Sequence, residues 1–334
     1  MNKRTEQDVV ISSRVRLARN LSEFPFPNKM TESQADQIIG KVRNAVGADV
    51  TYLDLKNMTN LDKQALVEQH LMSPVLVQKK QHSALFLSKD QSVSIMVNEE
   101  DHLRIQSIVP GLQLQEAYQK ADQADDQLEN ALSFSFEEQT GYLTACPTNA
   151  GTGMRASVML HLPALTANQQ INGLIASVGK MGFAVRGLYG EGSQADGDLY
   201  QISNQITLGL SEQDTLNQLQ SVAEQIIERE VELRRAMVER NRAEMCDLVW
   251  RAFGTVKYAQ IMTAKEFMAL ASQIRLGISM GIITHISSQH LNRLMIAVQP
   301  ANLQKHCGRE LTPAERDFER ASYLRKEIEN GKDE

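Results

Sequence analysis

The 334-residue sequence has few cysteines and no long apolar run, and these absences narrow the classes of protein to which it can belong. Cys146, Cys246 and Cys307 are too few and too scattered for a disulfide framework, and their odd number favours a reducing compartment. Polar residues and glycines interrupt the longest apolar candidate, at 276–286, which argues against a membrane-spanning helix. The N-terminus lacks the apolar core of a signal peptide. We therefore expect a cytoplasmic protein without a membrane partner.

An excess of positive charge is also missing. The formal net charge of -6 and the pI near 5.7 argue against a nucleic-acid-binding platform. No Gly-x-Ser-x-Gly elbow of a serine hydrolase occurs. His285 and His290 are five residues apart rather than four, which does not fit a helical zinc motif, so no metal site built from the protein is predicted.

The composition changes along the chain. Residues 1 to about 210 mix short strand-like runs with turns and a few helices, such as 32–45 and 62–71, which predicts an α/β or α+β layer structure. From Ser211, a plausible N-cap, to about Phe253, apolar residues recur at helical spacing with hardly a breaker. This pattern indicates one long amphipathic helix or two.

Helix formers continue to the end of the chain. Thr312 as N-cap, Pro313 at the first helical position and Glu315 three residues after the cap mark the start of a last helix, which should end before Gly331. We therefore predict two domains, a first at 1–235 and an all-helical one at 236–334.

The segment at 98–104 (Asn-Glu-Glu-Asp-His-Leu-Arg) has the highest density of reactive side chains. It follows a run at 92–97 that alternates polar and apolar residues, which predicts a half-buried strand whose end presents Glu99, Glu100 and Asp101. Adjacent carboxylates repel, so at least one pKa rises unless a metal or a cationic substrate lies between them. A solvated turn is the ordinary alternative.

Arg14 and Arg16 are two residues apart in an extended segment. Their guanidinium groups should lie on one side, while Val15 and Leu17 face the other. Two guanidinium groups in one space suit a polyphosphate, because each can bond two anionic oxygens. A basic edge strand that resists aggregation is the competing interpretation.

The segment at 144–157 predicts a turn-rich loop that runs into a helix beginning near Met154. Residues 151–156 formally match the dinucleotide fingerprint G-x-G-x-x-A, but turn residues replace the preceding strand, and no acid follows about 20 residues later to hold a ribose. With Arg155 at the expected helix N-terminus, the loop is a candidate anion cradle. Cys146 is either an ordinary buried thiol or a thiolate that faces a cationic substrate.

A second loop, at 187–197, is rich in glycine and carries Glu191, with Arg186 just before it. Glycine gives such a loop the freedom to close over a ligand, although a plain turn is an equal alternative. No Gly-Lys-Ser/Thr follows, so it is not a Walker A loop.

Five of these motifs resemble the phosphagen (guanidino) kinase family in order and spacing. They are Ser12-Ser13-Arg14-Val15-Arg16, the segment 98–104, Cys146-Pro147-Thr148-Asn149 with Gly151-Thr152-Gly153, Arg155-Ala156-Ser157-Val158, and Arg186-Gly187 with Gly190-Glu191. The early position of the first arginine pair, without the family's usual N-terminal helical domain, and the helical C-terminal part resemble the bacterial protein-arginine kinases. The resemblance implies an α+β fold: a phosphagen-kinase (glutamine-synthetase-like) catalytic domain with an antiparallel sheet and flanking helices, plus a C-terminal all-helical domain.

The resemblance also implies an ATP-dependent kinase that phosphorylates arginine side chains of proteins. Glu100 would bind the guanidinium and act as base, with Glu191 as its partner and Cys146 nearby. Magnesium would be held through the ATP phosphates rather than by a protein metal site. The residues that match the family's nucleotide-binding positions are Ser12, Ser13, Arg14, Val15, Arg16, His70, Arg104, Arg155, Ala156, Ser157, Val158, Met159, Arg186, Gly187, Leu188, Tyr189, Gly190 and Glu191.

In the last helix, Arg316, Asp317 and Arg320 match the phosphoarginine-sensing motif of the protein-arginine kinases. Arg316 and Arg320 are four apart, so they share a helix face and could bind a phosphate, and Asp317 could hold the guanidinium. Without the resemblance, this segment is an ordinary solvated charged face.

The implied partners are proteins with exposed arginines, including a stress-gene repressor, a Clp ATPase/protease, a zinc-binding activator protein and a second copy of the chain in a homodimer. Nucleic acid is not among the expected partners. Two other functions stay open: a kinase of free arginine or another small guanidino compound, and a phosphoarginine-binding adaptor with an inactive kinase site.

Overall fold

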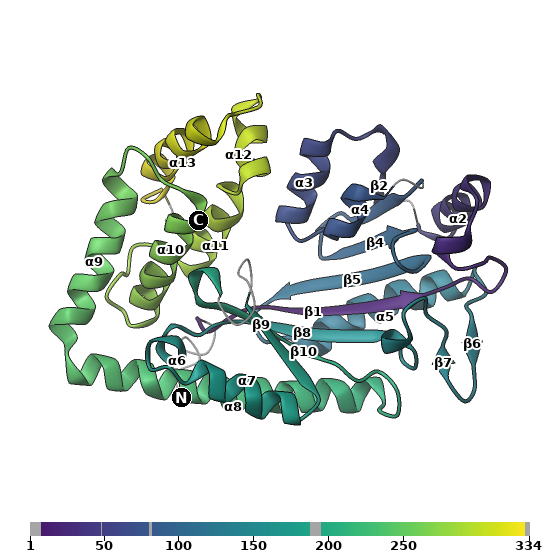
Figure 1. The fold of residues 1–334 in the computed structure, drawn as a ribbon, viewed down its shortest axis with the longest axis horizontal. Coiled ribbons are helices and arrows are strands. Elements are labelled where there is room, and N and C mark those ends of the chain that lie inside the picture. The colour runs from purple at the N-terminus through teal and green to yellow at the C-terminus, as the bar shows by residue number, and fades with distance from the viewer. Residues whose placement is uncertain (1–7, 48, 80–81, 188–194, 331–334) are drawn as a thin grey trace.

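A computed structural model describes residues 8–47, 49–79, 82–187 and 195–330. Figure 1 shows a large twisted sheet with long helices along one side and a group of helices at one end. The sheet has eight strands in the order β2-β3-β4-β5-β1-β8-β10-β9, and its neighbouring strands pair antiparallel. Its strands are β1 (Val10–Arg19), β2 (Val50–Asp54), β3 (Ala84–Ser88), β4 (Val93–Val97), β5 (Leu103–Pro110), β8 (Met154–His161), β9 (Phe183–Gly187) and β10 (Leu199–Asn204). Strands β6 (Phe136–Glu137) and β7 (Gly141–Tyr142) form a separate two-stranded sheet.

Helices make up much of the rest of the described chain. The α-helices are α2 (Glu32–Ala45), α3 (Asn60–Glu68), α4 (Pro74–Gln78), α5 (Leu114–Glu129), α6 (Pro163–Ala167), α7 (Ile171–Lys180), α8 (Glu212–Arg240), α9 (Arg242–Tyr258), α10 (Ala264–Ser279), α11 (Ser288–Ala297), α12 (Pro300–Cys307) and α13 (Pro313–Glu327). Short 3-10 turns are η1 (Pro27–Lys29), η2 (Leu55–Asn57), η3 (Pro147–Asn149) and η4 (Asp196–Asp198). The antiparallel sheet with flanking helices and a helical C-terminal part confirms the predicted fold class.

The two faces of the sheet are covered differently. Helices α5, α7 and α8 lie along one face (Figure 1), where Val15, Leu17, Ala156 and Val158 are buried in the main core. On the opposite face, α3 and α4 cover β3 and β4 with a smaller apolar cluster. Over the middle of that opposite face, β1 and β8 present polar side chains, and this is where the candidate site lies.

Three predicted helix starts are confirmed by their caps. Thr31 forms a capping box at the start of α2, and Thr312 forms another with Glu315 at the start of α13. Ser211 accepts a hydrogen bond from the backbone N–H of Asp214 and caps α8. The helix expected at 62–71 is α3, which starts and ends slightly earlier, and Gly331 lies outside the described residues.

Three expectations about strands were wrong. The helix expected near Met154 is the strand β8, because Ala156, Val158 and Leu160 alternate with more polar residues and enter the main core. The run at 92–97 is not half-buried, because α3 and α4 cover the face of β4 that carries Met96. The alternative of a basic edge strand also fails, since β1 lies between β5 and β8 near the middle of the sheet.

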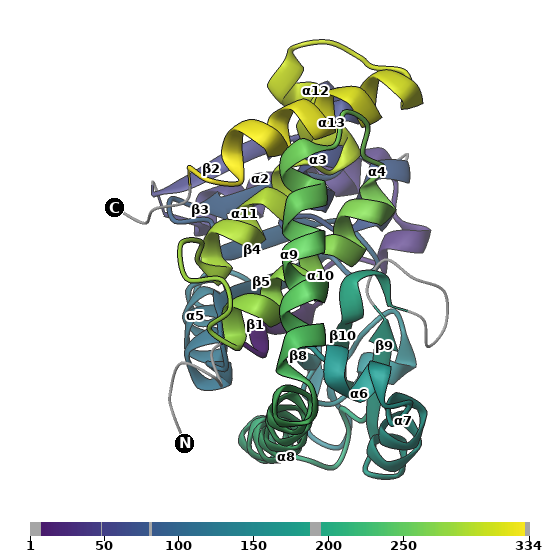
Figure 2. The same ribbon diagram turned by 90° about the vertical axis from the view of Figure 1, so that its left-hand side faces the viewer.

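Helices α9 to α13 build a second apolar core. Helix α8 ends at Arg240, the extended Asn241 breaks the helical path and caps α9, and α9 turns sharply away from α8 (Figure 2). The predicted boundary at 235 and 236 falls within the last two turns of α8, and the division into domains stays a prediction. The second core also contacts the first part of the chain, because Glu68 at the end of α3 accepts hydrogen bonds from the N-terminal backbone of α12.

Candidate active site

The open face of the sheet carries a set of arginines on neighbouring strands. Arg14 and Arg16 alternate with residues of β1 that are buried in the main core, so both point to the open face. In the register of the sheet, Arg16 lies opposite Arg155 of β8, and Arg104 of β5 lies opposite Ala18. The period of two along each strand therefore places all these guanidinium groups on the same side.

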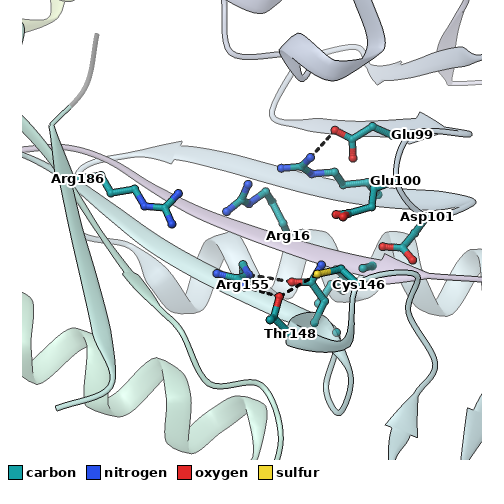
Figure 3. Close-up of a pocket in the computed structure, with 13 residues that line it drawn as sticks. Arg16, Glu99, Glu100, Asp101, Cys146, Thr148, Arg155 and Arg186 are labelled. Atoms are coloured by element: carbon teal, nitrogen blue, oxygen red, sulfur yellow. Dashed lines mark hydrogen bonds and ion pairs between the residues drawn. The ribbon is translucent and has the colours of Figure 1, made fainter. Parts of the chain in front are cut away.

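Arg16, Arg104 and Arg155 line a pocket of about 270 Å³, together with Arg186 of β9. Figure 3 shows Arg16, Arg155 and Arg186 directed into one space, with Glu100 and Cys146 at the other end of it. The pocket is lined by Arg16, Leu17, Ala18, Glu99, Glu100, Asp101, Arg104, Cys146, Thr148, Asn149, Gly153, Arg155 and Arg186. Five separate segments of the chain thus contribute to it.

The crowded cations are under electrostatic stress. Burial and the nearby Arg104 lower the pKa of Arg14 to about 10. Burial lowers the pKa of Arg16 well below its ordinary value, and the charges of Arg14, Arg104 and Arg155 lower it further. The Nε atom of Arg16 is buried without a hydrogen-bond partner among the described residues. A ligand with several negative charges would relieve both conditions.

The three adjacent acids differ in their burial and in their bonding partners. Glu99 is buried and pairs with Arg104, with 2.5 Å between Oε1 and Nη1, and it also accepts a hydrogen bond from Ser73. Although burial would raise the pKa of Glu99, the pairing with Arg104 lowers it. Asp101 is also buried, and its Oδ1 accepts hydrogen bonds at 2.6 Å from the Asn20 amide and from a backbone N–H of the 143–146 loop.

Glu100 is the exposed member of the three, and its side chain reaches the pocket. Partial burial raises the pKa of Glu100, and the neighbouring Asp101 and Glu99 carboxylates raise it further. The arrangement is that of a carboxylate that can attract a cation and that takes up a proton more readily than an ordinary glutamate. The acid segment is therefore not a solvated turn. The side chains of Glu99 and Asp101 are buried and bonded to other residues, which fixes the turn that carries Glu100.

His102 also helps to fix the turn that carries the three acids. Its Nδ1 accepts the backbone N–H of Leu21 at 3.0 Å, and its Nε2 donates to the carbonyl of Pro25 at 2.9 Å. Burial lowers the pKa of His102 to about 4, so the ring is neutral. This histidine fixes the acid turn against the loop that follows β1.

The loop before β8 joins Cys146 to the arginines. The Sγ of Cys146 lies 3.1 Å from the hydroxyl of Thr148, and Arg155 donates to Thr148 at 3.3 Å and to the side-chain oxygen of Asn149 at 2.9 Å. Thr207 in turn holds this loop through the carbonyls of residues 148 and 150. Arg155 thus does not lie at a helix N-terminus, as expected, but on strand β8, where it is bonded to the loop that precedes the strand.

A second pocket, of about 330 Å³, lies nearer the start of β1 and is mostly apolar. Ser12 and Met159, opposite each other on β1 and β8, lie in its floor, and His70 stands at its wall after α3. Burial and the charge of Arg14 lower the pKa of His70 to about 4, so the ring is neutral and suited to an uncharged aromatic ligand. The lining is Ile11, Ser12, Gln69, His70, Leu71, Gln91, Ile108, Val109, Pro110, Met159, Leu199, Met268, Asn292, Met295 and Ile296.

The structure separates the predicted nucleotide-binding residues into groups. The side chains of Ser12, Arg14, Arg16, His70, Arg104, Arg155, Ser157, Met159 and Arg186 lie on the open side of the sheet or line the two pockets. Those of Ser13, Val15, Ala156 and Val158 are buried, and the last three belong to the main core, so their backbones alone can face a ligand. Gly187 ends β9, and Leu188, Tyr189, Gly190 and Glu191 lie outside the described residues.

Residues of the apolar pocket were missed from the sequence. Leu199, Met268 and Met295 come from β10, α10 and α11, which are far from β1 in sequence. Single apolar residues in ordinary strand and helix patterns carry no signal for a ligand. Thr148 and Asn149 belong to the predicted motif at 146–149, but the sequence does not show that their side chains bond to Arg155.

The predicted phosphoarginine-sensing residues do not form an exposed pair in this structure. Arg320 is buried and donates to the carbonyls of Met262 and Val298 and to Asp317. Arg316, one turn earlier on α13, is half-buried. Asp317 is already paired with the protein's own guanidinium, at 2.6 Å.

The described residues contain neither a membrane-spanning helix nor a cluster of metal ligands. No helix among them is long and apolar enough to span a bilayer. No group of three or more His, Cys, Asp or Glu side chains among them is placed to hold a metal ion.

Comparisons with known proteins agree over most of the chain. The model of the "ATP:guanido phosphotransferase, C-terminal catalytic domain" family matches residues 31–233, and that of the "Protein-arginine kinase McsB C-terminal domain" matches residues 242–334. A protein-arginine kinase from Caldanaerobacter subterraneus subsp. tengcongensis is 50% identical over 326 residues, which cover 96% of this chain and 96% of the relative. One from Pelotomaculum thermopropionicum is 48% identical, covering 97% of this chain and 94% of the relative.

Solved structures show the same fold. A lombricine kinase superposes with a TM-score of 0.61 at 24% identity, over 69% of this chain and 68% of that one. The duplicated taurocyamine kinase from Schistosoma mansoni, with bound transition state analog components, gives a TM-score of 0.63 at 26% identity, over 75% of this chain and 38% of that one.

Proposed function

The chain belongs to the ATP:guanido phosphotransferase family and, within it, to the protein-arginine kinases, and on that premise we propose that it transfers the γ-phosphoryl group of ATP to arginine side chains of proteins. It is therefore an enzyme, a phosphotransferase. One observation carries the proposal: a cluster of arginines faces a single open carboxylate, Glu100, across one pocket, and an apolar pocket lies nearer the start of the same strand, β1. The apolar pocket is suited to the adenine and ribose, and the arginines to the phosphates.

The chemistry needs little more than these groups. A nitrogen of the target guanidinium attacks the γ-phosphorus, the P–N bond forms while the bond to the β-phosphate oxygen breaks, and the nitrogen loses a proton. A guanidinium has a pKa above about 12 and is a poor nucleophile, so Glu100 would orient it and take the proton. The raised pKa of Glu100 supports this role. Glu191 would assist as a second carboxylate, and Cys146 would line the guanidinium end of the pocket.

Arg14, Arg16, Arg104, Arg155 and Arg186 would hold the phosphates and offset their charge. Mg²⁺ would be held through the ATP phosphates and, when bound, would neutralise charge that develops on the transferred group. The buried, unpartnered Nε of Arg16 supports a site that an anion completes.

Proteins, rather than free arginine, are the proposed acceptors, because eight relatives at 43–50% identity are protein-arginine kinases. A kinase of small guanidino compounds is the second candidate, since the structural neighbours include lombricine and taurocyamine kinases.

We also propose the cellular role implied by the family: marking proteins for a Clp ATPase/protease and inactivating a stress-gene repressor, in the cytoplasm. A zinc-binding activator protein and a homodimer belong to the same proposal. Co-purification of the Clp ATPase with a phosphorylated substrate, but not with the unphosphorylated one, would support the first part.

A regulatory role for Arg316, Asp317 and Arg320 is a further part of this proposal. A phosphoarginine bound there would replace Arg320 at Asp317 with its own guanidinium and place its phosphate near Arg316. Equal activity and assembly of wild type and Arg316→Ala, with and without phosphoarginine, would contradict it.

The central test is a phosphate transfer assay. The purified protein is incubated with Mg-ATP and either an arginine-rich protein or free arginine, and acid-labile phosphate on arginine is measured. We expect phosphate on the protein, its loss in Glu100→Gln, and no change in Glu228→Gln, which alters an exposed carboxylate on α8. Phosphate on free arginine alone would identify a small-molecule guanidino kinase. ATP binding without transfer to either acceptor would favour the adaptor.

A further inference from the structure

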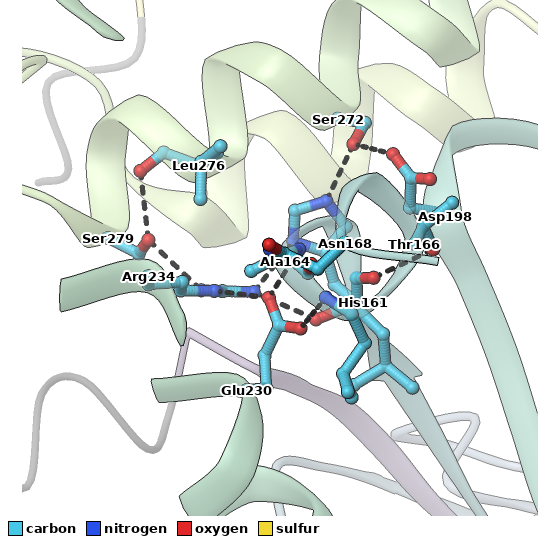
Figure 4. A network of polar contacts seen from close by, with 12 residues as sticks. His161, Ala164, Thr166, Asn168, Asp198, Glu230, Arg234, Ser272, Leu276 and Ser279 are labelled. Carbon is cyan, nitrogen blue, oxygen red and sulfur yellow. Dashed lines mark hydrogen bonds and ion pairs between the residues drawn. The ribbon is translucent and has the colours of Figure 1, made fainter. Parts of the chain in front are cut away.

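Helix α10 docks against the catalytic part of the chain through hydroxyl groups. Ser272 and Ser279 are seven residues apart, so they lie on one face of the helix. Each joins a buried polar network that also includes Asp198 before β10, His161 at the end of β8, and Arg234 of α8 (Figure 4).

The network contains a continuous series of hydrogen bonds, here called the Asp198 chain. Nη2 of Arg234 lies 2.8 Å from the carbonyl oxygen and 3.3 Å from Nδ1 of His161. Nε2 of His161 lies 2.9 Å from the hydroxyl of Ser272, which lies 2.5 Å from Oδ2 of Asp198. Glu230 balances the charge of Arg234 at 2.7 Å and holds the start of α6.

The single hydroxyl proton of Ser272 fixes the direction of the chain. A carboxylate can only accept, so Ser272 donates to Asp198 and must itself accept from Nε2–H of His161. Nδ1 of His161 then has no proton and accepts from Arg234. Burial and the charge of Arg234 lower the pKa of His161, in agreement with a neutral ring. Donors therefore run in one direction from a cation to a carboxylate, and removing any member leaves a buried group unpaired.

Two members of the Asp198 chain lie at the ends of active-site strands, His161 as the last residue of β8 and Asp198 just before β10. His161 ends β8, the strand of Arg155, and lies opposite Leu199, which follows Asp198. Two residues further along β10, Gln201 lies opposite Arg186 of β9, about 10 Å from Asp198 at strand spacing. The Asp198 chain thus fixes the strands that present Arg155 and Arg186, two of the arginines proposed to hold the phosphates.

The turn that carries Asp198 depends on α10 in a second way. Gly197 and Asp198 both have left-handed backbone conformations, with φ of 67° and 55°. A Cβ atom on Gly197 would lie 2.8 Å from the carbonyl oxygen of Met268 on α10. A non-glycine residue holds such a conformation when its surroundings impose it, and here the surroundings are α10. Met268 also lines the apolar pocket, so the same helix contacts the site twice.

We propose that the Asp198 chain is a positioning device, through which α10 holds β8, β10 and β9 in the register that directs Arg155 and Arg186 at the phosphates. The inference deepens the proposed function and rests on it for its kinetic test. It makes the C-terminal helices part of the catalytic geometry, since a shift of α10 changes the support of these two arginines.

The test compares three variants of the full-length protein. Ser272→Ala removes the central hydroxyl, and Ser272→Thr keeps it. Ser288→Ala is the matched control, because Ser288 on α11 also donates to a carboxylate of the first part of the chain, Asp8, at 2.7 Å, but neither residue belongs to the Asp198 chain. We expect kcat to fall about tenfold in Ser272→Ala, in line with the loss of a charge-assisted buried hydrogen bond, and to recover in Ser272→Thr. Ser288→Ala should keep the wild-type kcat even if its melting temperature falls as far as that of Ser272→Ala.

Hydrogen exchange gives a readout that needs no kinase activity. Backbone amides of β10 and β9 should exchange faster in Ser272→Ala than in wild type and Ser288→Ala. Equal exchange in the two alanine variants, or equal kcat, would overturn the proposal. If the wild type does not phosphorylate arginine, the proposed function fails, while the exchange comparison still decides the role of the Asp198 chain.

Discussion

Substitution of Glu100 should lower the rate of catalysis without lowering the stability of the protein. Glu100→Gln keeps the size of the side chain but removes its charge and its ability to take a proton. Loss of a positioned general base typically costs about 10²- to 10⁴-fold in rate, so we expect kcat to fall by at least about 100-fold. Since Glu100 is exposed and repelled by its two acidic neighbours, the free energy of unfolding should be unchanged or slightly higher.

Asp101→Ala should show the opposite balance. The Oδ1 atom of Asp101 accepts two hydrogen bonds at 2.6 Å, from Asn20 and from the backbone N–H of Ala145, and an alanine in its place removes the acceptor of both. A buried donor left without a partner costs about 1–3 kcal/mol of stability. The loop that carries Cys146 is then less firmly held, and kcat should fall by less than in Glu100→Gln.

The pH dependence of kcat/KM gives an independent check on Glu100. A base is active when ionised, so activity is lost as the pH falls through its pKa. Because partial burial and then Asp101 and Glu99 raise the pKa of Glu100, the acid limb should lie above the ordinary glutamate value of 4.5. The assay is initial-rate protein phosphorylation across pH with ATP affinity measured separately. A Glu100→Gln variant that keeps more than about a tenth of kcat, or an acid limb at or below 4.5, would refute the assignment of the base.

Three further outcomes follow from the structure. Asp125→Ala should lower the free energy of unfolding by about 3–5 kcal/mol in urea titrations, because it leaves Arg19 buried without its carboxylate, whereas Asp247→Ala, in an exposed pair, should leave the midpoint unchanged. Glu68→Gln should speed hydrogen exchange at the start of α12, because it weakens the bonds that tie α12 to α3, and unchanged protection there would contradict this. The pKa of Glu315 is lowered to about 2 by its bonds to the backbone and side chain of the N-cap and to a nearby arginine, so its contribution to α13 is present above about 4.5 and is lost as the pH falls toward 2, which amide exchange in α13 would detect.

Local sequence signals predicted the parts of the fold that depend on neighbours in the chain. The caps at Ser211 and Thr312 were visible because capping uses residues within four positions. The alternation around Arg14 and Arg16 gave the open face of β1 for the same reason. The error at Met154 came from the glycine-rich loop before it, which suggested a helix N-terminus although the following residues alternate as a strand does.

The division of labour within the acid turn was beyond sequence reasoning. The sequence shows three adjacent carboxylates, at Glu99, Glu100 and Asp101, and does not distinguish them. Their environments differ because Arg104 pairs with Glu99, while Asn20 and the 143–146 loop donate hydrogen bonds to Asp101. Among the described residues, Glu99 and Asp101 have side-chain partners, whereas Glu100 is exposed at the pocket. The partners of its two neighbours fix the turn that carries it, so the same contacts leave Glu100 as the carboxylate that a ligand can reach.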